Sequence, residues 1–312
     1  MMKVLIVASN NKHQFAPFVV EQVEALRSCG CEVEYFGVSG KGLSGYLKNR
    51  SSLKNKIKAF QPDVIHAHYG LSGLLANLQC RVPVVTTYHG SDINDPKVFR
   101  FSRMAMRLSA WNIFVSRGIM NKAKATKKCS LIPCGVAMEK LQPLDKTEAR
   151  EVIKLLPDKK YVLFASAFDN AVKDAPLAFE VVQLIRSSEV QLLELKGYTR
   201  EEVNRLLCAV DALLMTSFNE GSPQVIKEAM ACGCPIVSVD VGDVKERVNG
   251  LDGCFVAQSR EPHELAELLQ KVLSFEGRTE GRERLVADGL DNKSIARRLV
   301  KIYEKVSRNG NR

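Results

Sequence analysis

The chain contains 312 residues, of which 46% are hydrophobic and 26% charged. This composition is typical of a globular protein and excludes a disordered, collagen-like or coiled-coil chain. No apolar run approaches the roughly 20 residues that a membrane-spanning helix needs, and Met1-Met2-Lys3 leads into a strand without the layout of a signal peptide. Nine cysteines, an odd number, favour reduced thiols over a disulfide framework. We therefore expect a cytoplasmic protein.

The positive charge is concentrated in the first half of the chain. Residues 1–150 contain 22 basic and 10 acidic side chains, whereas residues 151–312 contain 23 and 25. This asymmetry predicts that the two halves have different electrostatic roles.

In chain order, short apolar runs alternate with segments of helical periodicity. We expect strands at 3–8, 31–36, 63–68, 82–88, 112–116 and 130–133, and helices at 15–26, 53–60 and 99–108. Residues 135–160 are polar and contain two prolines, which indicates a connection between domains. The pattern then resumes with strands at 161–165, 190–195, 212–217, 235–240 and 254–257, and helices at 175–185, 200–207, 223–231, 261–273, 282–289 and 292–306.

This alternation predicts an α/β protein with two doubly wound, Rossmann-like domains, each built on a parallel sheet. We place them at 1–143 and 144–291, followed by a C-terminal helix within 292–312. Because ligands of such sheets bind beyond the carboxyl ends of the strands, we expect the site in a cleft that the two domains face.

One motif matches a dinucleotide-binding pattern, but we reject that interpretation. Gly40-Lys41-Gly42-Leu43-Ser44-Gly45 matches G-x-G-x-x-G, but it follows the second strand. The acidic residue expected about 20 positions later, at the end of the next strand, is absent. We expect a flexible loop and no nicotinamide-dependent chemistry.

Histidines occur in or after two of the predicted strands. His66 and His68 lie on the same side of one strand, and we interpret them as cleft or core histidines because a metal site would need further ligands. His89 opens His89-Gly90-Ser91-Asp92 directly after another strand. Gly90 allows close approach of a ligand and Asp92 is near, so a functional role is favoured for His89.

The strongest signal extends from Phe218 to Pro235. A turn carries Glu220-Gly221-Ser222, Pro223 opens a helix as its first residue, and Glu228 lies about a turn and a half further on. The amides of the first helical turn and the positive end of the helix dipole form an anion site. Carboxylates on both sides of such a site suit a nucleotide sugar, with phosphates at the amides and sugar hydroxyls at the carboxylates.

Glu220-x7-Glu228 in this segment resembles the E-x7-E signature of family 4 retaining glycosyltransferases, which have the GT-B fold. His89–Asp92 is similar to a His-Gly-x-Asp-like loop of the first domain in that family. Gly135-Val136, after the last strand of that domain, and Lys173, after the first strand of the second, also match the family pattern.

The resemblance implies a hexosyltransferase of GT-B fold whose C-terminal helix crosses back to the first, acceptor-side domain. It implies that Glu220 contacts hydroxyls of the donor sugar, that Glu228 contacts the ribose, and that Lys173 neutralises the diphosphate. His89 would lie near the transferred sugar. The other donor-binding residues implied are those at the helix start: Gly221, Ser222, Pro223, Gln224 and Val225.

Two positions depart from the family pattern. Phe168 stands where an arginine usually precedes the lysine by five positions, so one phosphate cation is missing or is supplied by Lys227 or Arg117. The usual Gly-Gly loop after the first strand is replaced by Ser9-Asn10-Asn11-Lys12.

Because no Asp-x-Asp motif occupies a plausible loop, we expect transfer without a metal ion or cofactor. The expected donor is a UDP- or GDP-linked sugar, and the expected acceptor is a glycan or a lipid-linked molecule of cell-surface polysaccharide biosynthesis. A sugar-nucleotide epimerase, a phosphorylase and a catalytically degenerate relative are alternatives on the same architecture. Nucleic acid is not an expected partner, because the basic residues are not interleaved with aromatic ones.

One predicted helix suggests a further partner. Lys97, Arg100, Arg103 and Arg107 recur at helical spacing, close to Phe99, Phe101, Met104 and Met106. A second basic stretch comprises Lys41, Lys48, Arg50, Lys54, Lys56 and Lys58. These residues predict peripheral attachment of the first domain to an anionic surface, at the inner face of the cell membrane.

Overall fold

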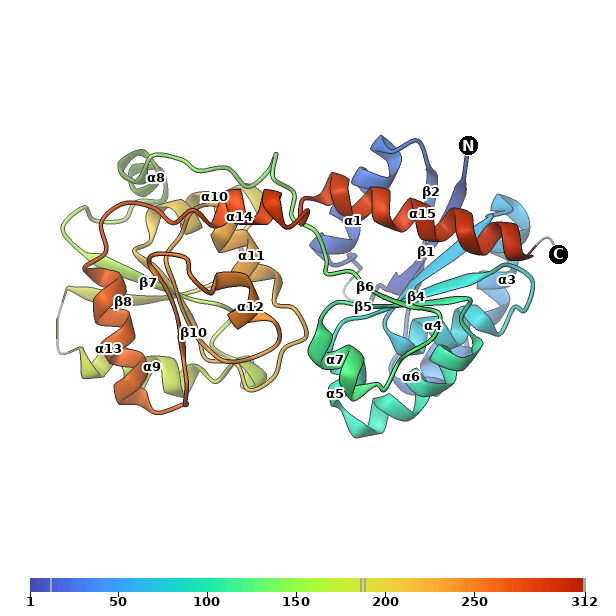
Figure 1. Cartoon of the computed structure of the whole chain (residues 1–312), viewed down its shortest axis with the longest axis horizontal. Coiled ribbons are helices and arrows are strands. Elements are labelled where there is room, and N and C mark those ends of the chain that lie inside the picture. Colours follow the sequence, from blue (N-terminus) through green and yellow to red (C-terminus); the bar gives the residue numbers. More distant parts are fainter. Residues whose placement is uncertain (12, 186, 188, 311–312) are drawn as a thin grey trace. The chain divides into compact units, whose positions relative to one another are not determined.

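The chain forms two compact units, seen in a computed structural model that describes residues 1–11, 13–185, 187 and 189–310 (Figure 1). Unit 1 consists of Met1–Gly135 and Asn292–Arg312, and unit 2 of Val136–Asp291. The prediction of two Rossmann-like α/β domains is confirmed. The units meet in the chain at Gly135 and Val136, whereas the sequence analysis placed the boundary at 143. The two connections pair here, since Val136 forms a parallel bridge with Asp291 and its amide donates to the carbonyl of Leu290.

Unit 1 is built on a parallel sheet whose strand order is β2-β1-β3-β4-β5-β6 over the described residues. Its strands are β1 Lys3–Ser9, β2 Glu32–Val38, β3 Val64–His68, β4 Val84–Tyr88, β5 Trp111–Phe114 and β6 Cys129–Leu131. Its helices are α1 Pro17–Ser28, α2 Gly42–Leu47, α3 Arg50–Phe60, α4 Gly70–Asn77, α5 Ser91–Asn94, α6 Pro96–Leu108, α7 Arg117–Lys122 and α15 Asn292–Gly310. The strands are apolar almost throughout because both faces of a parallel sheet are covered by helices.

The C-terminal helix α15 belongs to unit 1 and runs along α1 (Figure 1). Its buried side chains recur every three or four residues, as expected for a helix that covers a core with one face. They are Ile295, Ala296, Leu299, Ile302, Tyr303 and Val306. The return of this helix to the first domain, which the family resemblance implied, is therefore seen in the structure.

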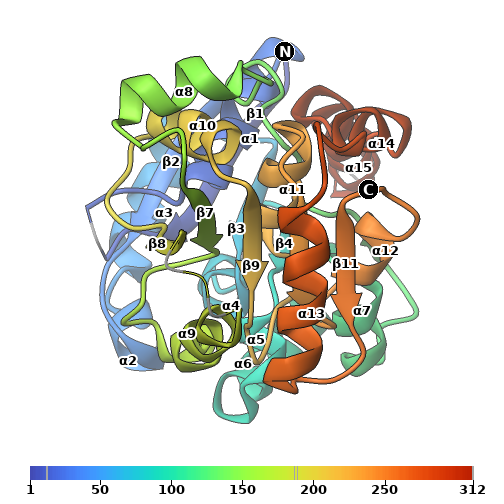
Figure 2. The same cartoon turned by 90° about the vertical axis from the view of Figure 1, so that its left-hand side faces the viewer.

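Unit 2 repeats the architecture with the strand order β11-β10-β9-β7-β8 over the described residues (Figure 2). Its strands are β7 Lys160–Phe164, β8 Val190–Glu194, β9 Ala212–Met215, β10 Ile236–Val239 and β11 Cys254–Ala257. Its helices are α8 Lys146–Ile153, the 3-10 turn η1 Ala171–Lys173, α9 Ala175–Leu184, α10 Arg200–Ala209, α11 Gln224–Ala231, α12 Val244–Val248, α13 Pro262–Leu273 and α14 Gly281–Ala287. Helices α9 and α13 form a core with the sheet through side chains such as Val181 and Leu269.

The strand order of unit 2 defines where a ligand is expected. Strands β7 and β9 are neighbours. The chain leaves β7 towards β8 on one side of this pair and leaves β9 towards β10 on the other, so the two connections run in opposite directions. The carboxyl ends of two such strands flank the switch point at which open α/β sheets bind ligands. Lys173 follows β7 and Glu220 follows β9.

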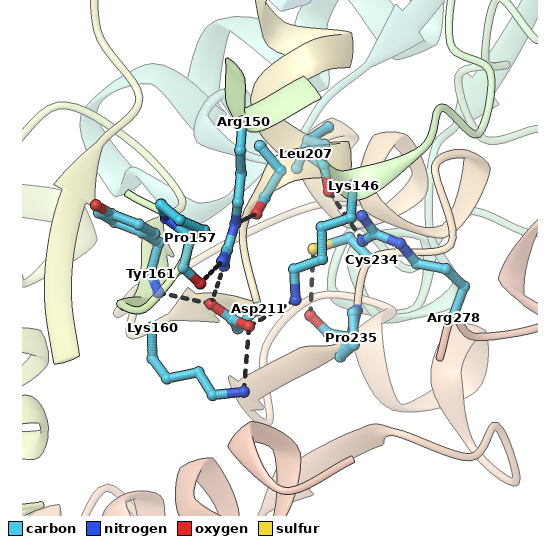
Figure 3. Close-up of polar contacts among 11 residues, drawn as sticks. Lys146, Arg150, Pro157, Lys160, Tyr161, Leu207, Asp211, Cys234, Pro235 and Arg278 are labelled. Carbon is cyan, nitrogen blue, oxygen red and sulfur yellow. Dashed lines mark hydrogen bonds and ion pairs between the residues drawn. The ribbon is translucent and has the colours of Figure 1, made fainter. Parts of the chain in front are cut away.

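A cluster of charges at the opposite, amino-terminal end of β9 has a structural role (Figure 3). Asp211 accepts hydrogen bonds from Lys146 (2.6 Å), Arg150 (2.8 Å) and the amide of Tyr161 (2.7 Å), and thereby fastens α8 to the sheet. Burial alone would raise the pKa of Asp211, but the hydrogen bond from Lys146 and these other contacts outweigh burial and hold the pKa below its usual value. Lys146 and Arg150 therefore have a structural role in unit 2.

No helix in the described part of the chain is both long and apolar enough to cross a lipid bilayer.

Candidate functional site

The predicted pair Lys173 and Glu220 comes together at the switch point of unit 2. Lys173 ends the turn η1, and Glu220 lies in the loop between β9 and α11. The ammonium Nζ of Lys173 and the carboxylate Oε1 of Glu220 are 2.5 Å apart, with side chains 21% and 14% exposed. The lysine expected to neutralise a diphosphate thus carries a carboxylate counterion in the structure, and the two groups lie within reach of one ligand.

The start of α11 differs from the sequence prediction by one residue. Pro223 is the N-cap, with φ −67° and ψ 120°, and Gln224 is the first helical residue. Proline has no side-chain oxygen, so the N-cap provides no hydrogen bond to the amides of the first turn. Those amides and the helix dipole favour an anion here.

The loop before α11 is held against the loop that follows β10. Ser222 Oγ donates to Asp243 (3.0 Å), which in turn accepts from Arg247 (2.9 Å). Gly242 has a positive φ of 61°, and a Cβ at this position would lie 2.9 Å from the carbonyl oxygen of Gly221. A glycine is therefore required for the close approach of the two loops, which fixes the backbone of Gly221 beside Glu220.

Glu228, which the family resemblance assigns to the ribose of the donor, lies within α11. It is buried, and its Oε1 accepts a hydrogen bond from Arg200 at 2.7 Å. Arg200 is a site residue that the sequence analysis missed. Thr199 and Glu202 form a capping box, which predicts a helix start at Arg200, but the sequence holds no signal for its pairing across 28 residues.

Of the two suggested substitutes for the missing phosphate arginine, Lys227 lies close to the predicted anion site. Only 1% of Lys227 is exposed, and its Nζ is 3.2 Å from Ser222 Oγ. It places a positive charge beneath the start of α11. Arg117, the first residue of α7, is exposed in unit 1.

A second missed residue, Arg260, connects the loops that carry Lys173 and Glu220. Its guanidinium donates to Asp174 (2.5 Å) and to the carbonyls of Thr216 (2.8 Å) and Ser217 (3.0 Å), and it stacks 4.3 Å over the ring of Phe218. Thr216 Oγ1 adds 2.9 Å bonds to the carbonyls of Lys173 and Asp174. Arg260 follows β11, far from both loops in sequence, so only the fold brings these residues together.

The His89 loop of unit 1 is built around a buried carboxylate. Asp92 Oδ1 accepts from the amides of His89 and Gly90, both at 3.0 Å, and Oδ2 accepts from the amide of Gly70 at 3.1 Å. Burial raises the pKa of Asp92 to about 6, against the opposing effect of these bonds. Asp92 therefore orders the backbone of the loop, because its carboxylate oxygens bind the backbone amides of His89, Gly90 and Gly70.

The imidazole of His89 instead contacts His68, whose Nδ1 lies 3.0 Å from His89 Nε2. It also packs against the rings of Phe18 and Tyr69. His66 and His68, interpreted from the sequence as cleft or core histidines, are fully buried and therefore belong to the core. The described residues contain no group of three or more His, Cys, Asp or Glu side chains that could hold a metal ion.

Of the four residues that replace the family's Gly-Gly, Ser9 ends β1, and Asn10 and Asn11 follow it. Asn11 Oδ1 accepts from the amide of Gly40 (2.7 Å), and Asn11 Nδ2 donates to the carbonyl of Gly40 (3.1 Å). Lys12 lies outside the described residues. The Gly40–Gly45 segment, which was expected to be a flexible loop, is partly helical from Gly42, because Tyr46 is buried beneath it.

Both halves of the chain match glycosyltransferase families. Residues 4–140 match Glycosyltransferase Family 4, and residues 176–274 match Glycosyl transferases group 1. Two solved structures share the fold along the whole chain. Sucrose-phosphate synthase from Thermosynechococcus elongatus has a TM-score of 0.82 at 17% identity, covering 98% of this chain and 99% of that one. Anabaena Alr3699/HepE in complex with UDP and glucose has a TM-score of 0.74 at 16% identity, covering 98% and 100%.

Two relatives are similar to this chain in sequence. TuaC of Bacillus subtilis, a glycosyltransferase provisionally assigned to teichuronic acid biosynthesis, is 26% identical over 61% of this chain. The uncharacterised glycosyltransferase MJ1178 of Methanocaldococcus jannaschii is 28% identical over 86% of this chain. The matched region spans 56% of TuaC and 82% of MJ1178.

The two parallel-sheet units and the structural neighbours define the GT-B fold of glycosyltransferases. With matches along both halves, the chain belongs to the family 4 glycosyltransferases, which are sugar-transferring enzymes.

Proposed function

We propose that this protein transfers a sugar from a UDP- or GDP-linked donor to a glycan or lipid-linked acceptor, with retention of anomeric configuration, in cell-surface polysaccharide biosynthesis. The observation that carries the proposal is the convergence of Lys173 and Glu220, 2.5 Å apart, at the switch point of unit 2. The start of α11, where the N-cap Pro223 makes no side-chain hydrogen bond, and the Glu228–Arg200 pair extend this site. The UDP and glucose bound to the structural neighbour HepE and the provisional assignment of TuaC to teichuronic acid biosynthesis support the choice of donor and process.

The charges of the site suggest how a nucleotide sugar would bind. Lys173 would exchange Glu220 for the diphosphate, and the first amides of α11, including those of Gln224 and Val225, would bind phosphate oxygens. The released carboxylate of Glu220 would accept hydrogen bonds from hydroxyls of the donor sugar. Glu228, held by Arg200, would accept from the ribose hydroxyls.

The reaction would then depend on electrostatic stabilisation of the leaving group. The bond from the acceptor oxygen to the anomeric carbon forms on the same face from which the bond to the diphosphate breaks. The proton of the acceptor hydroxyl passes to the departing phosphate oxygen. Lys173, Lys227 and the α11 terminus would stabilise the developing negative charge, an effect that reaches several kcal/mol in preorganised sites. No protein nucleophile, metal ion or cofactor is assigned, and His89 would donate a hydrogen bond to the transferred sugar.

A screen of nucleotide sugars by thermal shift tests the proposal. A ligand at 100 times its dissociation constant stabilises a protein by about 2.7 kcal/mol, so one class of UDP- or GDP-linked sugars should raise the melting temperature while oligonucleotides should not. Transfer from that donor to lipid-linked and glycan acceptors is then followed by release of nucleoside diphosphate. Conversion of the donor without an acceptor would favour an epimerase, and stabilisation by none of the nucleotide sugars would reject the proposal.

We also propose that α6 docks unit 1 on an anionic membrane. Lys97, Arg100, Arg103 and Arg107 are all exposed on this helix, together with Met104 (48%) and Leu108 (54%). Phe99 and Met106 pack into the core around Tyr88 and Phe114, so they are not available to lipid, contrary to the sequence analysis. Helix α4 contacts both α6 and α2, and the basic stretch that includes Lys41 and Lys48 flanks α2 (Figure 2).

The predicted attachment is weak and reversible at the inner face of the cell membrane. Each basic residue near an anionic surface contributes about 1 kcal/mol, so the four on α6 should give binding that salt reverses. Liposome co-sedimentation should show binding to vesicles with anionic lipid at low salt only. Arg103→Glu with Arg107→Glu should abolish it, whereas Lys271→Glu on α13 should not. Equal binding to neutral and anionic vesicles, or to neither, would reject the docking.

A further inference from the structure

A chain of buried polar side chains leads from the C-terminal helix to His89. The hydroxyl of Tyr303 on α15 is 2.6 Å from Nδ1 of His66. The amide nitrogen Nε2 of Gln22 on α1 lies 3.4 Å from both His66 Nδ1 and His68 Nε2. His68 Nδ1 is 3.0 Å from His89 Nε2. The first four of these residues are buried, so each proton in the chain needs an acceptor.

The direction of the chain is set at its α15 end. Among the described residues, His66 Nδ1 is the acceptor in hydrogen-bond range of the fully buried Tyr303 hydroxyl. Burial raises the pKa of Tyr303 well above its usual value, so the hydroxyl keeps its proton and donates it. His66 Nδ1 is therefore unprotonated, and its Nε2–H donates to Thr87 Oγ1 at 2.7 Å.

The remaining hydrogen bonds then have one consistent direction. An unprotonated His66 Nδ1 must face the NH2 group of Gln22, because the amide oxygen would repel its lone pair. The same NH2 group donates to His68 Nε2. Burial lowers the pKa of His68 to about 3 and that of His66 well below its usual value, so both rings are neutral near pH 7. A neutral His68 that accepts at Nε2 carries its proton on Nδ1 and donates to His89 Nε2.

We propose that His68 is a positioning residue for His89: its Nδ1–H occupies His89 Nε2 and fixes His89 as the Nδ1–H tautomer, with Gln22 and Tyr303 setting the direction. His89 Nδ1 faces the thiol of Cys134 at 3.7 Å, a weak acceptor that an oxygen of a bound sugar can replace. His89 is thereby prepared as a hydrogen-bond donor and not as a base. The role of this tautomer in catalysis rests on the function proposed for His89 in sugar binding. The assignment of the tautomer rests only on the hydrogen bonds described above.

The tautomer is measured on the full chain labelled with ¹⁵N-histidine, with the His89 resonances assigned by their loss in His89→Gln. In the unmodified protein we expect a protonated Nδ1 and an unprotonated Nε2 at His89. His68→Leu should give a mixture of tautomers and lower the transfer rate about tenfold, a loss of one hydrogen bond. His68→Asn should restore both, because its amide nitrogen occupies the place of Nδ1.

Tyr303→Phe is the milder variant, since it removes one hydroxyl, and three side chains of the hydrogen-bonded chain separate Tyr303 from His89. Without the Tyr303 hydroxyl, His66 Nδ1 can carry a proton, and the Gln22 amide group can then rotate by 180°. His68 would no longer be held in one tautomer, so His89 should again show both tautomers. A protonated Nε2 at His89 in the unmodified protein would overturn the inference, as would an unchanged tautomer in both His68→Leu and Tyr303→Phe. If the tautomer behaves as expected but His89→Gln transfers sugar at the normal rate, the inference holds and the role of His89 in the proposed function fails.

Discussion

At the scale of residues, the site of unit 2 is a set of ion pairs that a ligand would rearrange. Lys173 is paired with Glu220 and Arg200 with Glu228, and both pairs are largely shielded from solvent. A diphosphate competes with Glu220 for the same ammonium group. The carboxylate of Glu220 should therefore oppose nucleotide binding, whereas the carboxylate of Glu228 should support it.

Glu220→Gln should tighten the binding of UDP or GDP while it slows sugar transfer. Loss of the carboxylate frees Lys173 from a pair of about 1 kcal/mol, which corresponds to about a fivefold gain in affinity. Transfer should fall about a hundredfold or more, because the sugar hydroxyls lose their acceptor. Glu228→Gln should instead weaken nucleotide and donor alike by about tenfold or more, since a charged hydrogen bond to the ribose is lost. Calorimetric titration of both variants, with exposed Glu267→Gln as control, tests this contrast, and equal changes in the two variants would contradict it.

The buried carboxyl of Asp92 predicts a pH dependence of stability. Its pKa in the folded state is about 6, above the ordinary aspartate value of 3.8, so its contribution to the free energy of unfolding is greatest at low pH and is lost as pH rises through 6. Between pH 7.5 and pH 5 the unmodified protein should gain about 1.4 kcal/mol relative to Asp92→Asn. Buried His66 and His68, whose pKa values are lowered, oppose this trend but are present in both proteins. Urea unfolding at the two pH values measures the difference, and a constant difference would refute the assignment.

At the scale of elements, the strands were predictable and several helices were not. Apolar runs such as Val4–Val7 require burial on both faces, which identifies parallel strands from sequence alone. Helix α4 gave no such signal, because its two glycines, Gly70 and Gly73, disfavour a helix. The structure requires both, since a Cβ at Gly70 would meet Ser102 Oγ at 2.0 Å and one at Gly73 would meet Thr86 at 2.6 Å. Tertiary packing overrides local propensity there.

The site was predictable in its motif but not in its pairings. Glu220 and Glu228 stand in one continuous segment, so their spacing is visible in the sequence. Arg200, which pairs with Glu228, begins α10, and Arg260, which pairs with Asp174, follows β11, so no local pattern in the sequence signals either pairing. Such contacts depend on strand order, which periodicity does not determine.

Arg260 should contribute both to the stability of the protein and to nucleotide binding, because it joins two loops of the site. Arg260→Ala removes the bonds that join the Lys173 and Phe218 loops, and we expect a loss of about 1–2 kcal/mol in stability with weaker nucleotide binding. Arg260→Lys should recover less than half of the loss, because an ammonium group lacks the planar fork that spans Asp174 and two carbonyls. Thermal unfolding and titration with nucleotide measure both effects. Arg205→Ala, which breaks an exposed pair with Glu201, serves as control, and an equally small effect of Arg260→Ala would contradict the role.

At the scale of the whole molecule, the last helix in the chain completes the first unit. A chain that ends at residue 291 lacks α15 and the buried side chains Ile295, Leu299, Tyr303 and Val306. Burial of four such side chains contributes about 6 kcal/mol or more, which approaches the stability of a whole domain. We expect unit 1 of the truncated chain to be digested by protease under conditions in which the full chain resists. A truncated chain that stays resistant and active would show that α15 is dispensable.

Sugar transfer as proposed requires above all that Lys173 and the start of α11 bind the diphosphate of a nucleotide sugar. Calorimetric titration of the full chain with UDP and with GDP tests it most directly, with Lys173→Ala and Lys271→Ala compared at equal ionic strength. We expect one nucleotide to bind to the unmodified protein and to Lys271→Ala, and Lys173→Ala to weaken its binding about tenfold or more, because a charged hydrogen bond is lost. Binding of neither nucleotide, or equal affinity in Lys173→Ala, would contradict it.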